Sequence, residues 1–324
     1  MKASTFAGLG VLFATIALGG CAPSPAGVVS PAGGADVTHA SITFQDLLYV
    51  SNANGTVSVY RYQQRTLVAV LTDFTQPKGA CADSTGSVYV ADYQRNAIYE
   101  YAHGGKKPIA TLDDSPYTPY ACAASPPNRN LAVANLPSNG YYKTGNVAIF
   151  LHGTGKPSIL HLPNGNQPFG CAYDDRGDLL IAARIKYSSF WYDKFYYLPR
   201  DAQKLIPMQL PGLNYYSVAN LIEGVAWDGE YWVVGPIYQE LYLYTISVKA
   251  SQAGEIELSG NDISAGPVAI YRKSLKSRGT QIVAGVGASA VYYWSYPTGD
   301  YVNQITKYLD DPFGVAISLG EPRT

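Results

Sequence analysis

The chain has 324 residues, 47% of them hydrophobic, which is enough for one large domain or two domains of ordinary size. Its formal net charge is −1 and only 15% of its residues are charged, which excludes the basic surface that nucleic-acid binding requires. The 28 tyrosines and 32 glycines suit short β-strands joined by tight turns.

Residues 1–21 have the pattern of an export signal. The apolar run from Ala7 to Leu18 follows a basic start and is too short to span a bilayer stably. It ends in Leu18-Gly19-Gly20-Cys21, which resembles the bacterial lipobox, where the cysteine is lipidated and becomes the new N-terminus. The alternative is an ordinary secretory signal in which Cys21 has no role. Ala22 follows the cysteine, so the resemblance to enterobacterial sorting favours the outer membrane.

The remaining chain divides by composition. Residues 22–40 are rich in Ala, Gly, Ser and Pro, a composition that cannot bury a core and predicts a flexible tether. Residues 41–320 carry the repeats described next, and residues 321–324 form a short tail.

One short phrase recurs along residues 41–320 at intervals of roughly 40 to 55 residues, a spacing typical of propellers and solenoids. Three copies contain Pro, a small residue and Cys, and three contain Val and Ala. The copies are Pro77–Asp83, Pro119–Ser125, Pro168–Asp174, Ile222–Asp228, Ala265–Tyr271 and Pro312–Ser318.

Each phrase is followed by a turn and then by further β-rich runs. In the first complete unit these runs are Val88–Asp92, Ala97–Tyr101 and Pro108–Leu112. Four antiparallel strands per unit predict an all-β, six-bladed β-propeller rather than an open solenoid, whose repeats would be shorter and whose ends would need caps.

The two ends of the chain complement each other. The run 48–52 has no phrase before it, and the phrase 312–318 has no strand after it. We therefore expect the C-terminal strand to pair with the N-terminal blade, which closes the ring and satisfies two sheet edges.

The repeated unit resembles the NHL repeat, Pro-x-Gly-Val-Ala-x-Asp followed by a turn and Gly-x-Val-Tyr-Val-Ala-Asp. Residues 83–92 give the closest copy, and the resemblance extends over residues 45–320. It implies a propeller architecture without implying one activity, because such propellers include scaffolds, binders and enzymes.

The position after the phrase's Pro points towards the mouth of the central channel. We predict the ligand-binding site there, at Lys78, Tyr120, Phe169, Glu223 and Phe313, with Gly266 completing the ring. Six-bladed lactonases of the gluconolactonase family carry metal-binding Glu, Asn and Asp at this position, whereas this chain offers only Glu223. We therefore expect no metal or other cofactor, and we expect Glu223 to be solvated or paired with Lys78.

Cys81, Cys122 and Cys171 lie inside the phrase, in positions that other copies fill with Val or Ala. We interpret them as small buried hydrophobic residues. The alternative is a Cys81–Cys122 bridge between neighbouring blades, which requires close Cα atoms.

The other polar residues indicate structure. Asp83, Asp174 and Asp228 precede turns and are expected to accept turn N–H bonds. The neighbours Asp113 and Asp114 should point apart on extended chain, which excludes a two-carboxylate site. The aromatic-rich segment within 185–221 is expected to be partly strand and partly a loop over one face, and could be packing or a contact surface.

Together these features predict an exported, lipid-anchored propeller at the bacterial cell envelope that binds a protein, peptide or glycan. No nucleophile with a base, phosphate loop or zinc spacing is recognisable, so we identify no catalytic residues and favour a binding module over an enzyme. The alternative is a lactonase-like or related propeller hydrolase using Glu223.

Overall fold

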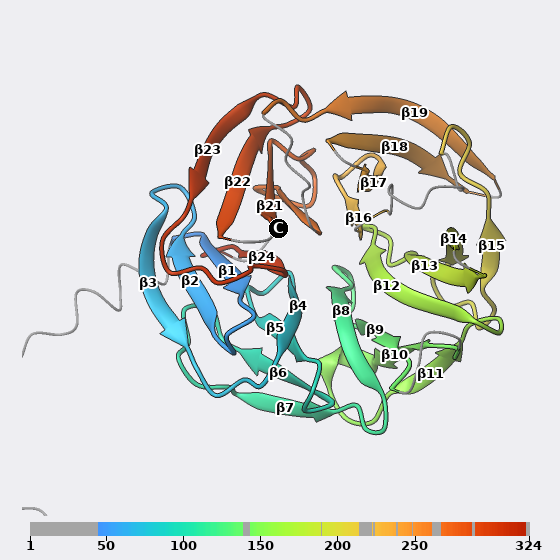
Figure 1. The fold of residues 1–324 in the computed structure, drawn as a ribbon, viewed down its shortest axis with the longest axis horizontal. Helices are drawn as coiled ribbons and strands as arrows, with labels where there is room; N and C mark the ends of the chain where they lie inside the picture. Colours follow the sequence, from blue (N-terminus) through green and yellow to red (C-terminus); the bar gives the residue numbers. More distant parts are fainter. Residues whose placement is uncertain are drawn as a thin grey trace, which may run out of the picture. The chain divides into compact units, whose positions relative to one another are not determined.

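The computed structural model describes residues 45–138, 143–188, 190–213, 222, 224–237, 239–247, 249–260, 267–286 and 289–321. These residues form six four-stranded sheets arranged as blades around a centre (Figure 1). The predicted all-β six-bladed propeller is confirmed. Cys21, the predicted tether and Glu223 lie outside the described residues. In the described part of the chain, no helix is long and apolar enough to cross a membrane.

Blade 1 combines both ends of the fold. It consists of β24 (Val315–Ser318), β1 (Leu47–Ser51), β2 (Val57–Arg61) and β3 (Thr66–Leu71), in that order from the inside outwards. Leu48 of β1 pairs with Ile317 of β24, so the C-terminal strand completes the N-terminal blade as predicted.

Blades 2 to 4 follow in chain order. Blade 2 contains β4 (Pro77–Ala82), β5 (Val88–Asp92), β6 (Ala97–Tyr101) and β7 (Ala110–Asp113). Blade 3 contains β8 (Thr118–Ala124), β9 (Leu131–Leu136), β10 (Asn146–Phe150) and β11 (Ser158–His161), with the 3-10 turn η1 (Leu151–Gly153) between its last two strands. Blade 4 contains β12 (Asn166–Tyr173), β13 (Leu179–Tyr187), β14 (Phe190–Leu198) and β15 (Ile206–Met208).

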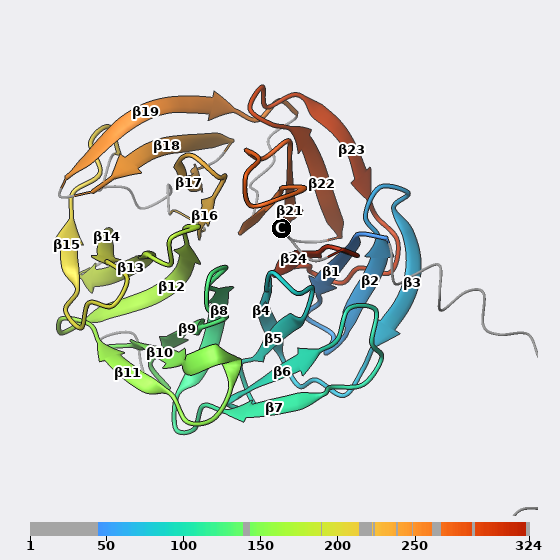
Figure 2. The ribbon, with the colours of Figure 1, turned by 180° about the vertical axis from the view of Figure 1, so that it is seen from behind.

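Blades 5 and 6 complete the ring. Blade 5 contains β16 (Gly224–Trp227), β17 (Trp232–Ile237), β18 (Glu240–Ile246) and β19 (Ala250–Glu257). Blade 6 contains β20 (Val268–Tyr271), β21 (Gln281–Val286), β22 (Ala290–Ser295) and β23 (Tyr301–Ile305). Seen from behind, the same blades surround the same centre (Figure 2).

The core lies between the blades, because each sheet is apolar on both faces. The described residues form a hydrophobic cluster at each junction between neighbouring blades. Between blades 4 and 5, for example, Leu180 and Tyr197 share a cluster with Trp232. Burial of such large side chains stabilises the fold by about 1.5–3 kcal/mol each.

The repeated Asp residues hold the turns after the inner strands. Oδ1 of Asp83 accepts hydrogen bonds from the backbone N–H groups of Thr85 and Ser87, and Asp174 and Asp228 bind their own turns in the same way. The predicted structural role of these carboxylates is confirmed.

Candidate functional site: the channel mouth

The six inner strands, β4, β8, β12, β16, β20 and β24, surround the central channel (Figure 1). Small residues line it because the strands approach closely: a Cβ added to Gly79 of β4 would lie 2.6 Å from the Cα of Ala121 in β8. The glycine of the repeated phrase is therefore a packing requirement of the inner strands.

Irregular pairing positions the predicted site residues. The registers of β4, β8 and β12 shift directly after Pro77, Pro119 and Pro168. Proline has no N–H to donate, and a bulge leaves a residue unpaired and redirects its side chain. Lys78, Tyr120 and Phe169 lie where the strand register shifts, so the repeated Pro explains why this position differs from its neighbours along the strand.

The structure brings three of the predicted residues together. The rings of Tyr120 and Phe313 meet edge to face, with centroids 5.1 Å apart, and Lys78 Nζ lies 4.8 Å from the Phe313 centroid. All three side chains are half-buried. Tyr93 extends the group, because its ring lies 6.4 Å from that of Tyr120. Tyr93 follows a second strand, and the inner-strand repeat gave no signal for it.

Phe169 differs from these residues. It is only 2% exposed and belongs to the cluster between blades 4 and 5. Arg184 of β13 covers its ring, with the guanidinium carbon 4.0 Å from the centroid. Phe169 therefore packs as core beneath the mouth, and Arg184, for which the inner-strand repeat carries no signal, occupies the surface above it.

The mouth opens into a narrow channel. A cavity of about 70 Å³ is lined by Phe169, Phe313 and the small residues of the inner strands. A second cavity of about 170 Å³ lies along the later part of the same strands, next to Trp227 and Arg272.

An ion pair fixes the channel's opposite end. Arg272 is 2% exposed and bonds both carboxylate oxygens of Asp175, at 2.9 and 2.8 Å. The indole N–H of Trp227 donates to the same carboxylate at 2.9 Å. Arg272 belongs to the loop after β20 and Asp175 to the turn after β12, so this contact links blades 6 and 4 across blade 5.

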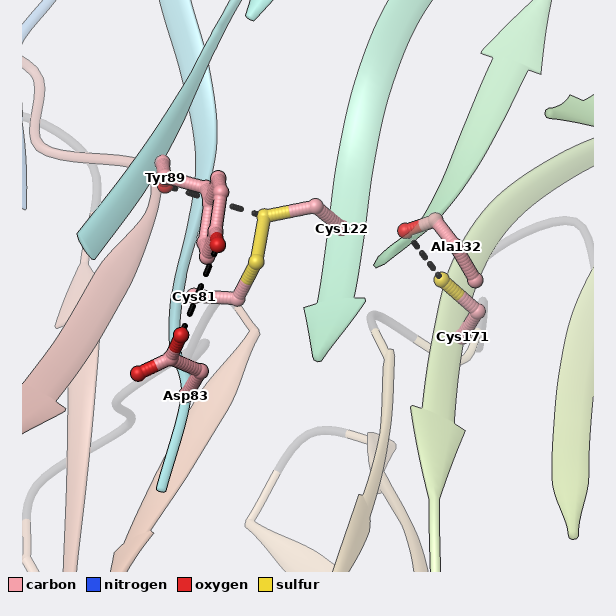
Figure 3. The surroundings of a disulfide bond; sticks show 6 residues. All are labelled: Cys81, Asp83, Tyr89, Cys122, Ala132 and Cys171. Carbon is pink, nitrogen blue, oxygen red and sulfur yellow. Dashed lines mark hydrogen bonds between the residues drawn. A yellow bond between two sulfur atoms is a disulfide. The ribbon is translucent and has the colours of Figure 1, made fainter. Parts of the chain in front are cut away.

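Cys81 and Cys122 form a disulfide, with Cα atoms 5.7 Å apart (Figure 3). The interpretation of these two residues as small buried hydrophobic residues is wrong, and the alternative bridge is present, because β4 and β8 approach closely enough at the channel wall. Cys171 of β12 is free and buried, as predicted. Burial raises the pKa of its thiol to about 12, so it is protonated at neutral pH.

The aromatic segment within 185–221 is mostly strand where it is described. β13 and β14 are nine residues each, and their pairing continues past Asn166, the first residue of β12, to Tyr187 and Phe190. The hairpin therefore extends on the mouth side, where Tyr187 is 73% and Phe190 is 47% exposed. Residues 214–221 lie outside the described residues.

Among the described residues, no group of three or more His, Cys, Asp or Glu side chains could hold a metal ion. The hairpin histidines lie on the side away from the mouth. His103 Nδ1 lies 2.6 Å from the Ser318 hydroxyl, and His152 Nδ1 lies 2.8 Å from the Asn128 carbonyl oxygen.

Solved structures of low sequence identity share this fold. A nidogen/laminin complex gives a TM-score of 0.61 at 14% identity, over 85% of this chain and 99% of that chain. Hydrazine synthase of Kuenenia stuttgartiensis gives 0.58 at 16%, over 82% and 81%. The β-propeller domain of Cps50 (Swd1) from Myceliophteria thermophila gives 0.54 at 11%, over 83% and 86%.

Neither a family model nor a curated protein matches the chain. At these identities the structural similarities establish the β-propeller class and do not establish an activity.

Proposed function

We propose that this propeller is an exported, lipid-anchored binding module whose channel mouth contacts a protein partner at the cell envelope. The observation that carries the proposal is the half-buried group of Lys78, Tyr120 and Phe313. Aromatic side chains are enriched in protein interfaces, and a few such residues commonly supply most of the binding energy.

The exposed aromatic residues of the β13–β14 hairpin support the proposal that the mouth side is the contact surface. Tyr187 and Phe190 stand at the tip of β13–β14 on the mouth side, where they would enlarge a contact surface beyond the channel. One structural neighbour, nidogen/laminin, is itself a protein complex, which offers a precedent for protein binding by this class of fold.

The disulfide supports an extracytoplasmic location, since such bonds persist in oxidising compartments and are rare in the cytosol. An extracytoplasmic location agrees with the export signal and with lipidation at Cys21. We also propose that the repeats are NHL-like.

Replacing Cys21 by Ser should release the protein from membranes and abolish incorporation of a labelled fatty acid. Absence of label on the wild-type protein would contradict the anchor.

The binding role is tested by capture from solubilised envelopes with the tagged full chain. The variant Tyr120→Ala/Phe313→Ala should lose the captured partner, and a loss of about 2 kcal/mol or more per hot spot corresponds to at least thirtyfold weaker binding. The matched control is Ile109→Ala/Leu151→Ala. It removes two exposed apolar side chains, 61% and 58% exposed, from hairpins on the opposite side.

The melting temperature is measured for both variants, because the mouth rings could serve as packing instead. A mouth variant that stays folded and still captures the same partner would contradict the proposal. A mouth variant that melts far below the control would assign Tyr120 and Phe313 to the core.

A further inference from the structure

Two cations stand over aromatic rings that line one cavity. Lys78 lies over Phe313, and Arg184 lies over Phe169. Both rings line the cavity of about 70 Å³ at the throat of the mouth. The cations come from blades 2 and 4, so they approach this cavity from different blades.

Neither cation has a hydrogen-bond or ion-pair partner within the described part of the chain. Nε of Arg184 is buried with no acceptor. Burial lowers the pKa of Lys78, although the nearby Asp311 acts in the opposite direction. Asp193 stands directly opposite Arg184 in the β13–β14 register, but the two form no ion pair. Partial burial of a cation without an acceptor is unfavourable, and a bound anion would offset this cost by pairing with the cation.

The two cations favour a planar anion. Arg184 and Lys78 lie over the rings that line the cavity and do not line it themselves, so a group bound between them would lie at the entrance of the cavity. A guanidinium presents a planar fork of donors that matches a carboxylate. Arg184 and Lys78 carry enough N–H donors to bind a phosphate as well, so the phosphoserine pool in the test below separates the two anions.

We propose that the mouth recognises a carboxylate, carried by an acidic side chain of a peptide segment of the partner, between Arg184 and Lys78. This inference rests on the proposed binding function and names the chemistry of the partner. The rings of Tyr120 and Phe313 would contact the apolar part of the same segment.

The test uses the purified full chain on arrays of degenerate peptide pools that contain Glu and Asp, the corresponding amides Gln and Asn, phosphoserine, or Lys. We expect binding to the acidic pool alone, with competition by free sodium glutamate only at far higher concentration. Arg184→Gln and Lys78→Gln should each weaken binding at least tenfold. Lys107→Gln, at an exposed lysine on the opposite side, should leave it unchanged.

Equal binding to the amide pool, stronger binding to the phosphoserine pool, or full retention by Arg184→Gln would overturn the carboxylate assignment. Equal potency of free glutamate and acidic peptide would overturn the peptide assignment. If the natural partner depends on Tyr120 and Phe313 but is insensitive to Arg184→Gln and Lys78→Gln, this inference fails and the proposed function stands.

Discussion

At the scale of single residues, Asp114 shows how burial changes a carboxyl group. Asp113 is exposed, whereas Asp114 is 1% exposed, so the two point apart as expected for extended chain. Neither oxygen of Asp114 makes a hydrogen bond of normal geometry. Burial raises its pKa to about 7, with the nearby Asn135 amide acting against this rise and Asp113 adding to it.

This shift predicts a pH-dependent stability. The unfolded carboxyl has a pKa of about 3.9, so between about pH 4 and pH 7 the folded state binds the extra proton and stability falls as pH rises. From pH 5 to pH 8 this group should cost the wild type roughly 2 to 3 kcal/mol relative to Asp114→Asn. Urea unfolding of both proteins at the two pH values measures the difference. A wild type that gains stability over the variant between pH 5 and pH 8 would refute the assignment.

At the scale of elements, the disulfide joins the inner strands of blades 2 and 3. Cys81 and Cys122 occupy positions one residue apart in the repeated phrase, so the sequence alignment of the copies does not place them opposite each other. Their proximity arises from the close approach of β4 and β8 at Gly79, a tertiary feature. The sequence therefore leaves two states open for this pair, a bridge and two thiols.

The bond closes a loop with a sequence separation of 41 residues, and the chain-entropy model assigns about 4 kcal/mol to such a loop. Cys81→Ser/Cys122→Ser should therefore unfold at markedly lower denaturant concentration, and the wild type should behave like it under reducing conditions. Cys171→Val is the control, because blades 5, 6 and 1 carry Val225, Val268 and Val315 at this position. If reduction left the wild type's unfolding midpoint unchanged, the bond would contribute no stability.

At the scale of the whole molecule, the repeats in the sequence predicted the closed ring of six blades. They did not predict which residues of the mouth are exposed, and the structure explains why. The six phrases became six inner strands, and the bulge after each of three prolines placed Lys78, Tyr120 and Phe169 at one end. The position after the Pro of the repeated phrase does not by itself distinguish Phe169, which lies in the core, from Phe313, which is half-buried. Arg184 was not predicted because it lies on β13, the second strand of blade 4, and only the folded structure places it beside the mouth.

Closure of the ring predicts the effect of truncation. A chain ending at Asp310 loses β24, which leaves one edge of β1 unpaired and removes the hydrogen bond from the Phe313 N–H to the Ser51 carbonyl. It also loses Ser318, whose hydroxyl donates to the Gly86 carbonyl of blade 2. We expect a large loss of thermal stability and solubility, with a chain ending at Glu321 as the unaffected control. An unchanged melting temperature of the shorter chain would contradict the shared blade.

Binding at the channel mouth can be measured by hydrogen–deuterium exchange with and without the captured partner. If the mouth is the binding face, exchange should slow in peptides covering residues 76–80, 117–121, 184–194 and 310–314. Exchange in the opposite hairpins, residues 102–109 and 151–156, should not change. Protection confined to those hairpins, with the four mouth segments unchanged, would contradict binding at the mouth.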